Sequence, residues 1–244
     1  MKPRTLITGG TRGIGAAIAQ RLAEAGHDLV LGYVHDDAAA ELAVAAAEAH
    51  GATCTSVRAD LLEPEGVEEL FAAAGEVTGV VNNAGATMHI GPLAETPVDI
   101  IRRTIELNLT AAVLVARAAV RVMSTAYTGS GGVLVNISSG AATRGAAGEY
   151  VQYAAAKAGI DVLTLGLADE VADQGIRVVG VAPGTIRTNI HADAGEPGRL
   201  DRVAAQIPLR RAGEPAEVAE AVAWLMSEAA SYVTGTTLRV AGGR

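Results

Sequence analysis

Short apolar runs alternate with longer, alanine-rich segments of helical period along almost the whole chain. The apolar runs predict seven β-strands, at residues 4–8, 28–33, 53–57, 79–81, 133–137, 176–181 and 236–240. The longer segments predict helices at residues 16–25, 38–50, 64–74, 98–123 and 215–227, and one more that carries Tyr153 and Lys157. We therefore expect residues 1–244 to form a single α/β domain, a Rossmann-like doubly wound parallel sheet of about seven strands.

Composition narrows the classes of function. Of the 244 residues, 50% are hydrophobic and only 3% are aromatic, which suits close packing of helices on a sheet and offers no stacking platform for nucleic acid. The formal net charge of −8 argues against nucleic acid and anionic membranes as partners. Any phosphate group must therefore bind at a local positive site.

Cysteine, histidine and hydrophobic segments bear on metal binding and compartment. Cys54 is the only cysteine, which fits a reducing compartment, and the five histidines lack metal-ligand spacing. The first ten residues do not have the pattern of a signal peptide, and Arg117 and Arg121 interrupt the most apolar helical stretch. We expect a soluble, cytoplasmic protein that binds neither a metal nor a membrane.

A glycine-rich turn separates the first predicted strand from the first predicted helix. Residues without side chains let backbone amides and a helix N-terminus approach a pyrophosphate, although a tight structural turn would also explain them. The spacing Gly9-x-x-x-Gly13-x-Gly15 differs from the commoner G-x-G-x-x-G. We expect the turn to bind a dinucleotide through Gly9, Thr11, Arg12, Gly13, Ile14 and Gly15.

The end of the second predicted strand bears on the choice between NAD(H) and NADP(H). An NAD site usually has Asp or Glu there, which accepts a hydrogen bond from the ribose 2′-hydroxyl. This chain has Tyr33 and His35 there, and the first acidic residue after the strand is Asp36. Arg12 can then pair with a 2′-phosphate, unless it is only a solvated turn residue. The pattern favours NADP(H).

Polar residues also follow or interrupt other predicted elements. Asp60 either accepts from the adenine amino group or caps the helix that begins near residue 64. Asn82-Asn83-Ala84-Gly85 is either a turn or a cofactor contact, and its place at a strand end favours contact. Asn108 lies among apolar residues, where its amide must be hydrogen-bonded, either as a core residue or in the site.

The most informative stretch is Tyr153-x-x-x-Lys157, which follows Ser138-Ser139. Residues four apart on a helix share one face, so the phenol and the ammonium can meet in one site. A nearby cation lowers the pKa of a phenol, but a value near 7 requires roughly 4 kcal/mol. We expect Lys157 to supply only part of this, so a bound nicotinamide cation or another positive group must contribute. The spacing alone does not decide between Ser138 and Ser139.

A polar segment follows the sixth predicted strand. The strand ends in Pro183-Gly184, and Ile186 and Thr188 come directly after it. Glycine, proline and charged residues then cluster from about residue 188 to residue 205. This composition predicts a mobile lid over a substrate.

Jointly, these motifs resemble the short-chain dehydrogenase/reductase family across essentially the whole chain. The glycine turn, Asn82-Asn83-Ala84-Gly85, Asn108, Ser139, Tyr153-x-x-x-Lys157 and Pro183-Gly184 occur in the family's order. Members with a Glu-Tyr-x-x-Tyr-x-x-x-Lys stretch like that from Glu149 to Lys157 are most similar, and they favour Ser139 over Ser138.

The resemblance implies a role for each motif. Tyr153 would be the acid/base, Ser139 would bind the substrate oxygen, and Lys157 would hold the nicotinamide ribose and lower the pKa of Tyr153. Asn108 would anchor a water in the proton relay toward Lys157. The implied cofactor contacts beyond the glycine turn are Tyr33, His35, Asp60, Leu61, Asn83, Ala84, Gly85, Tyr153, Lys157, Pro183, Gly184, Ile186 and Thr188. A homodimer or homotetramer is also implied.

We therefore expect an NADP(H)-dependent oxidoreductase that interconverts a ketone and a secondary alcohol of a small molecule. One alternative is an NAD-dependent sugar or polyol dehydrogenase. The other is a catalytically silent, cofactor-binding sensor, although such a protein has no chemical use for Asn108, Ser139, Tyr153 and Lys157 together. No motif identifies the substrate.

Overall fold

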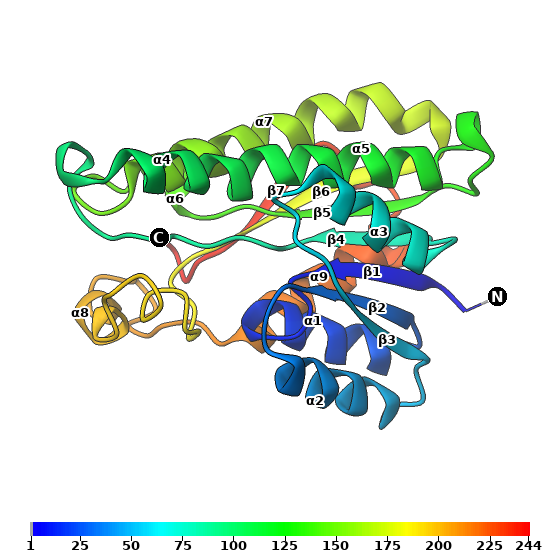
Figure 1. Cartoon of the computed structure of the whole chain (residues 1–244), viewed down its shortest axis with the longest axis horizontal. Coiled ribbons are helices and arrows are strands. Elements are labelled where there is room, and N and C mark those ends of the chain that lie inside the picture. The colour runs from blue at the N-terminus through cyan, green and yellow to red at the C-terminus, as the bar shows by residue number, and fades with distance from the viewer. Residues whose placement is uncertain (1) are drawn as a thin grey trace.

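The computed structural model describes residues 2–244 and places seven strands in one parallel sheet (Figure 1). The strand order is β3-β2-β1-β4-β5-β6-β7, so the sheet winds outward from β1 and β4 in both directions. Every neighbouring pair is parallel, and all carboxyl ends therefore lie at one edge. This confirms the predicted fold. The strands are β1 (Arg4–Thr8), β2 (Asp28–Tyr33), β3 (Cys54–Arg58), β4 (Gly79–Asn82), β5 (Gly132–Ile137), β6 (Ile176–Pro183) and β7 (Thr237–Val240).

Helices cover both faces of the sheet. One face carries α1 (Gly13–Glu24), α2 (Asp37–Glu48) and α9 (Pro215–Met226), below the sheet in Figure 1. The other face carries α3 (Pro64–Ala74), α5 (Ala111–Met123) and α7 (Val151–Val171). The shorter helices are α4 (Val98–Ile105), α6 (Ala141–Arg144) and α8 (Arg199–Ala204), which lie toward the side where the strands end. Single 3₁₀ turns span Leu93–Glu95, Thr125–Tyr127, Ala172–Gln174 and Glu228–Ala230.

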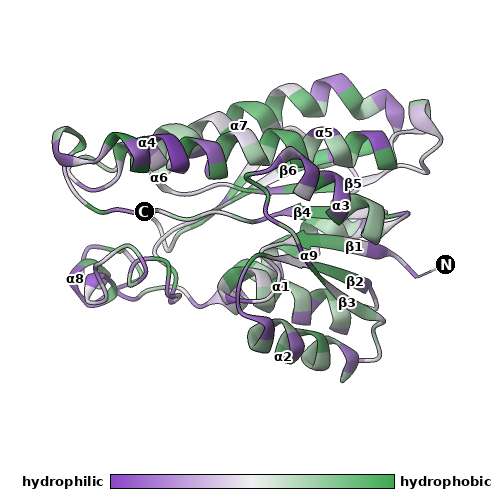
Figure 2. Ribbon diagram, viewed as in Figure 1, coloured by the Kyte–Doolittle hydropathy of each residue, from purple (hydrophilic) through white to green (hydrophobic). Residues whose placement is uncertain are grey.

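Two apolar layers hold the helices to the sheet. Successive residues of a strand point to opposite faces, so Ile7 packs in the layer under α1 and α9 whereas Leu6 packs in the layer under α3, α5 and α7. Both side chains are fully buried, and burial of each stabilises the fold by about 1.5–3 kcal/mol. Hydrophobic residues accordingly follow the strands, and hydrophilic residues lie on the outer surface of α2 (Figure 2).

The predicted continuous helix at 98–123 is wrong in one respect. A π-helical segment, Glu106–Thr110, separates α4 from α5. Asn108 lies at its centre, fully buried, and its Nδ2 donates to the carbonyl of Thr104 at 2.9 Å. The same nitrogen donates to the carbonyl of Ala86 at 2.8 Å, and Oδ1 accepts from the Ala86 amide. A side chain that binds the backbone within a helix explains the widened turn.

Within residues 2–244, no helix is both long and apolar enough to cross a membrane. The same residues contain no group of three or more His, Cys, Asp or Glu side chains placed to hold a metal ion. The cytoplasmic location stays a prediction.

Candidate active site

A cavity of about 1030 Å³ lies where the strands end, between the glycine turn and the segment that carries α8. It is lined by every residue predicted as catalytic or cofactor-binding except Asn108. Asn108 lies just behind Gly85, which forms part of the cavity wall. The space beside Gly85 is so narrow that a Cβ there would come within 2.6 Å of the Asn108 Oδ1 and 3.2 Å of the Lys157 Nζ. The cavity therefore brings together residues that are distant in the sequence.

The glycine turn is shaped by backbone that a side chain would disrupt. Gly9 and Gly13 have φ angles of +62° and +53°, in the region that favours glycine. A Cβ on Gly15 would lie 2.0 Å from the carbonyl oxygen of Gly9. Helix α1 begins at Gly13, three residues earlier than predicted, so the first-turn amides of α1 belong to the cavity wall. Such amides form a natural anion site.

Asn83 holds this turn in place. Its Nδ2 donates to the carbonyls of Thr8 and Gly9 at 2.9 and 3.1 Å, and its backbone amide donates to the Thr8 hydroxyl at 2.9 Å. Both amide hydrogens of the Asn83 side chain are thereby committed to the backbone of the turn. Of the two interpretations of this motif, the side chain of Asn83 supports the structural one, while Ala84 and Gly85 line the cavity.

The two acidic residues nearest the end of β2 both accept hydrogen bonds from other groups of the protein. Asp36 caps α2, since its Oδ1 accepts from the Ala39 amide at 3.0 Å. Asp37 accepts from the Tyr33 hydroxyl at 2.8 Å. Arg12, the exposed residue that precedes α1, makes no ion pair with any residue that the structure describes.

Asp60 lines the same end of the cavity but does not cap α3. The residue that precedes α3 is Glu63, which also makes no side-chain cap. The Asp60 carboxylate instead accepts from the Leu62 amide at 3.0 Å and shapes the turn after β3. The capping alternative is therefore wrong, and contact with the cofactor stays a prediction.

The side chains of Tyr153 and Lys157 lie together on α7, with the Lys157 Nζ 5.8 Å from the centre of the Tyr153 ring. Both are buried, with exposed fractions of 7% and 4%. The Lys157 Nζ donates to the carbonyl of Ile137, at the end of β5, at 2.9 Å. This bond anchors the ammonium to the sheet edge beside the phenol.

The two serines after β5 differ in their partners. The Ser138 hydroxyl is buried and donates to the carbonyl of Lys157 at 3.2 Å, which joins β5 to α7. The Ser139 hydroxyl lines the cavity and accepts from the Ala141 amide at 3.1 Å. It also lies near enough to the Tyr153 phenol to lower the pKa of that phenol. This geometry favours Ser139 as the serine that faces a substrate.

Burial dominates the electrostatics of the pair. It raises the pKa of Tyr153 to about 12, against the smaller influence of Ser139, which lowers it. Burial also lowers the pKa of Lys157 to about 8. Lys157 is not among the groups that shift the Tyr153 pKa. Desolvation of the phenol is therefore the larger effect in the protein by itself, and a lowering of the Tyr153 pKa by Lys157 together with a bound nicotinamide cation stays a prediction.

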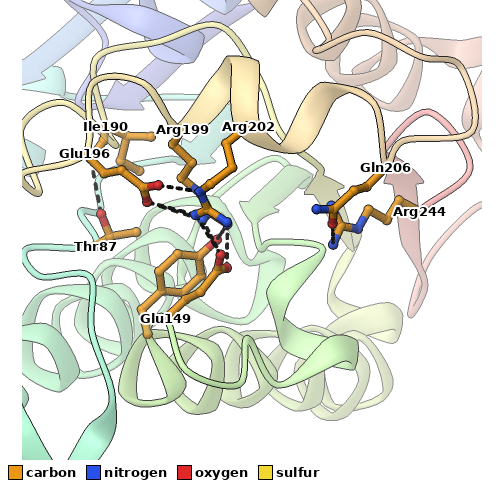
Figure 3. A network of polar contacts seen from close by, with 9 residues as sticks. Thr87, Glu149, Ile190, Glu196, Arg199, Arg202, Gln206 and Arg244 are labelled. Atoms are coloured by element: carbon orange, nitrogen blue, oxygen red, sulfur yellow. Dashed lines mark hydrogen bonds and ion pairs between the residues drawn. The ribbon is translucent and has the colours of Figure 1, made fainter.

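The segment from residue 188 to residue 205 closes one end of the cavity. Its His191 and Arg199 line the cavity together with Glu149 and Tyr150, which precede α7. Figure 3 shows Arg199 reaching across to Glu149, and the Glu196 carboxylate facing both Arg199 and Arg202. The sequence analysis missed this network, and no local pattern pairs residues fifty positions apart.

Comparison with known proteins gives consistent matches over the full length. A family model described as enoyl-(acyl carrier protein) reductase matches residues 9–244. The chain is 42% identical over 243 residues to the uncharacterized oxidoreductase YgfF of Escherichia coli (strain K12), covering 98% of each protein. It is 37% identical over 242 residues to glucose 1-dehydrogenase 2 of Bacillus subtilis (strain 168), covering 98% of this chain and 93% of that protein. The structure of a short chain dehydrogenase from Burkholderia cenocepacia J2315 in complex with NADP has a TM-score of 0.89 and 32% identity, covering 99% and 97%.

Proposed function

Because this chain belongs to the short-chain dehydrogenase/reductase family and is an NAD(P)-dependent oxidoreductase that acts on CH–OH groups, we propose that it interconverts a ketone and a secondary alcohol with NADP(H) as its preferred cofactor. The substrate is a small molecule that enters the cavity beside Tyr153. One observation carries the proposal: a single cavity joins the glycine turn to Ser139 and to a buried Tyr153 that has the Lys157 Nζ 5.8 Å from its ring centre.

The residues of the cavity fit a dinucleotide. The glycine turn and the first-turn amides of α1 suit its pyrophosphate, and positive φ angles at Gly9 and Gly13 keep side chains away from that space. Lys157 suits its nicotinamide ribose. When bound, the nicotinamide supplies or accepts the hydride.

In carbonyl reduction, the remaining work falls to residues of this chain. Ser139 and Tyr153 donate hydrogen bonds to the carbonyl oxygen, which orients the carbon and stabilises the developing charge. Tyr153 then gives its proton to that oxygen. With its pKa raised to about 12, the phenol is protonated at neutral pH, while the reverse reaction needs the phenolate and thus a nearby positive charge. Lys157 supplies part of this charge, and Asn108 holds its surroundings in place.

The preference for NADP(H) rests on the end of β2. Tyr33 stands where an acid would accept from the ribose 2′-hydroxyl, and the hydrogen bonds of Asp36 and Asp37 to other groups hold both carboxylates away from that role. Arg12 is exposed beside this end of the cavity and suits a 2′-phosphate. The NADP complex of the Burkholderia relative supports the same choice.

A cofactor and substrate panel tests the proposal. The wild-type enzyme is assayed by nicotinamide absorbance with NADPH and NADH against ketones, and with NADP⁺ and NAD⁺ against secondary alcohols. We expect turnover of some ketones and a higher kcat/KM with NADPH. No turnover of any ketone or alcohol would support the silent sensor instead, and a higher kcat/KM with NADH would reject the cofactor assignment.

A second candidate is an NAD-dependent sugar dehydrogenase. The identity of 37% to glucose 1-dehydrogenase 2 favours it. It requires turnover of aldoses with NAD⁺ that exceeds turnover of simple secondary alcohols with NADP⁺, so the same panel separates the two. Assembly into a homodimer or homotetramer and the lid role of residues 188–205 stay predictions.

A further inference from the structure

Tyr150 lies next to the reacting phenol but is held by a different part of the chain. Its ring meets the Tyr153 ring edge to face, with centres 5.5 Å apart. It lines the cavity and is buried, with an exposed fraction of 8%. The catalytic assignment proposed above uses Tyr153 and leaves Tyr150 without a role.

Three neighbours fix the ring of Tyr150. Besides Tyr153, the His191 ring stacks on it with centres 6.3 Å apart and planes at 17°. The Arg199 guanidinium lies 5.0 Å from the ring centre. His191 is uncharged at neutral pH, because burial and the nearby Arg199 lower its pKa to about 4. The position of the Tyr150 hydroxyl is therefore set before any substrate arrives.

Arg199 determines what the Tyr150 hydroxyl can do. The guanidinium is buried, with 4% of the residue exposed, and both of its terminal nitrogens donate to Glu149, at 2.6 Å for Nη2. Nη2 also donates to the Tyr150 oxygen at 2.8 Å. A guanidinium can only donate, so the Tyr150 oxygen is the acceptor and its own hydrogen must find another partner. No acceptor for that hydrogen is found anywhere in residues 2–244.

Resting on the proposed function, we propose that Tyr150 is a specificity residue, whose hydroxyl donates a hydrogen bond to a second oxygen of the substrate. Arg199 and Glu149 are its positioning residues. The preferred substrates are accordingly ketones that carry a further hydroxyl or carbonyl oxygen, rather than ketones with no other polar group. A buried donor left without a partner penalises the simpler ketone.

Matched ketones test this assignment in the complete enzyme with saturating NADPH. The probes are cyclohexanone, 2-hydroxycyclohexanone and 4-hydroxycyclohexanone, which share a ring and differ in the second oxygen. We expect the wild type to prefer one hydroxyketone over cyclohexanone in kcat/KM by about threefold to tenfold, the range of one neutral hydrogen bond. In Tyr150→Phe, kcat/KM for cyclohexanone should stay the same or rise, and the preference should vanish.

Two further variants separate recognition from structure. Tyr127→Phe removes a hydroxyl from an exposed tyrosine outside the cavity and should leave the preference intact. Arg199→Met should abolish the preference mainly by raising KM for the hydroxyketone, and Arg199→Lys should restore it in part, since lysine keeps the charge but not the two-pronged contact with Glu149. General loss of stability would lower kcat/KM for all three ketones alike.

The outcomes are distinct. Equal kcat/KM for the three ketones in the wild type, a preference that survives in Tyr150→Phe, or failure to reduce any of the three while other ketones are reduced would each overturn the assignment of Tyr150 and leave the proposed function standing. Failure to reduce any ketone at all would overturn the proposed function itself.

Discussion

The two halves of the cavity are built in different ways. The half formed by β1, α1 and β4 takes its shape from backbone: positive φ angles at Gly9 and Gly13, and amide hydrogen bonds from Asn83 to the turn. The half formed by residues 188–205 and the start of α7 takes its shape from side chains, with Arg199 bonded to Glu149 and Tyr150.

This difference suits the two tasks. A dinucleotide has the same pyrophosphate in every turnover, so a fixed cradle of backbone amides is sufficient. A substrate must be distinguished from chemically similar molecules. This requires fixed polar side chains, which are left without a hydrogen-bond partner when the wrong molecule binds. Tyr153 and Lys157 stand where the two halves meet. Changes in each place should therefore affect different measured quantities.

The largest effect is expected at the junction. Lys157→Met removes the cation that favours the phenolate and the donor to the Ile137 carbonyl. We expect kcat to fall about a thousandfold, within the range for a disabled acid/base group. Steady-state assays with saturating NADPH and substrate measure it. A kcat within about threefold of wild type would show that the pair does not act as a unit.

A change in the glycine turn, which belongs to the backbone half of the cavity, should weaken cofactor binding more than it slows the chemical step. A Cβ on Gly15 would clash with the Gly9 carbonyl. Because this carbonyl belongs to the backbone and not to a flexible side chain, the turn itself must shift to make room. We expect Gly15→Ala to raise the Kd for NADPH about tenfold to hundredfold, as measured by fluorescence titration. Gly166→Ala on α7 is the control, because a Cβ there meets nothing within 4 Å. A Kd unchanged by Gly15→Ala would remove the glycine turn from the site.

A smaller change should affect cofactor choice alone. Arg12→Ala removes the cation assigned to the 2′-phosphate, and we expect the ratio of kcat/KM for NADPH to that for NADH to fall about tenfold. Arg21→Ala is the matched control, since Arg21 lies on α1, the helix that Arg12 precedes, pairs with Glu220 and does not line the cavity. An unchanged ratio in Arg12→Ala would mean that Arg12 is a solvated turn residue.

The smallest effect concerns stability in alkali. Between about pH 8 and 10.5 the unfolded chain binds more protons at Lys157 than the folded protein does, because burial lowers this pKa to about 8. The free energy of unfolding of the wild type, relative to Lys157→Met, should therefore increase as the pH rises through this window. Tyr153 and Cys54, whose pKa values burial raises, act oppositely but are present in both proteins. Urea unfolding at pH 8 and pH 10 checks the sign.

The backbone half could be predicted from the sequence because its signals are local. Each strand is an apolar run, and the glycines and asparagines at strand ends lie next to the elements that they serve. The break in the helix at Asn108 could not be predicted in this way. It depends on a bond between Asn108 and Ala86, which belong to segments that meet only in the folded chain.

The side-chain half was predicted only in outline. Proline, glycine and charge marked residues 188–205 as a segment over the cavity, but nothing in that composition pairs Arg199 with Glu149 or places His191 against Tyr150. The rise in the pKa of Tyr153 that burial causes could not be predicted, for the same reason. The spacing of Tyr153 and Lys157 gives their proximity, whereas the burial that raises the pKa depends on the whole fold.

The central claim is that one buried phenol at the junction transfers the proton. Tyr153→Phe tests it most directly, with NADPH binding and ketone turnover measured on the same preparation. The account predicts that kcat falls about a thousandfold or more while the Kd for NADPH stays within about twofold of wild type. A variant that binds NADPH and still reduces the ketone at the wild-type rate would contradict the account.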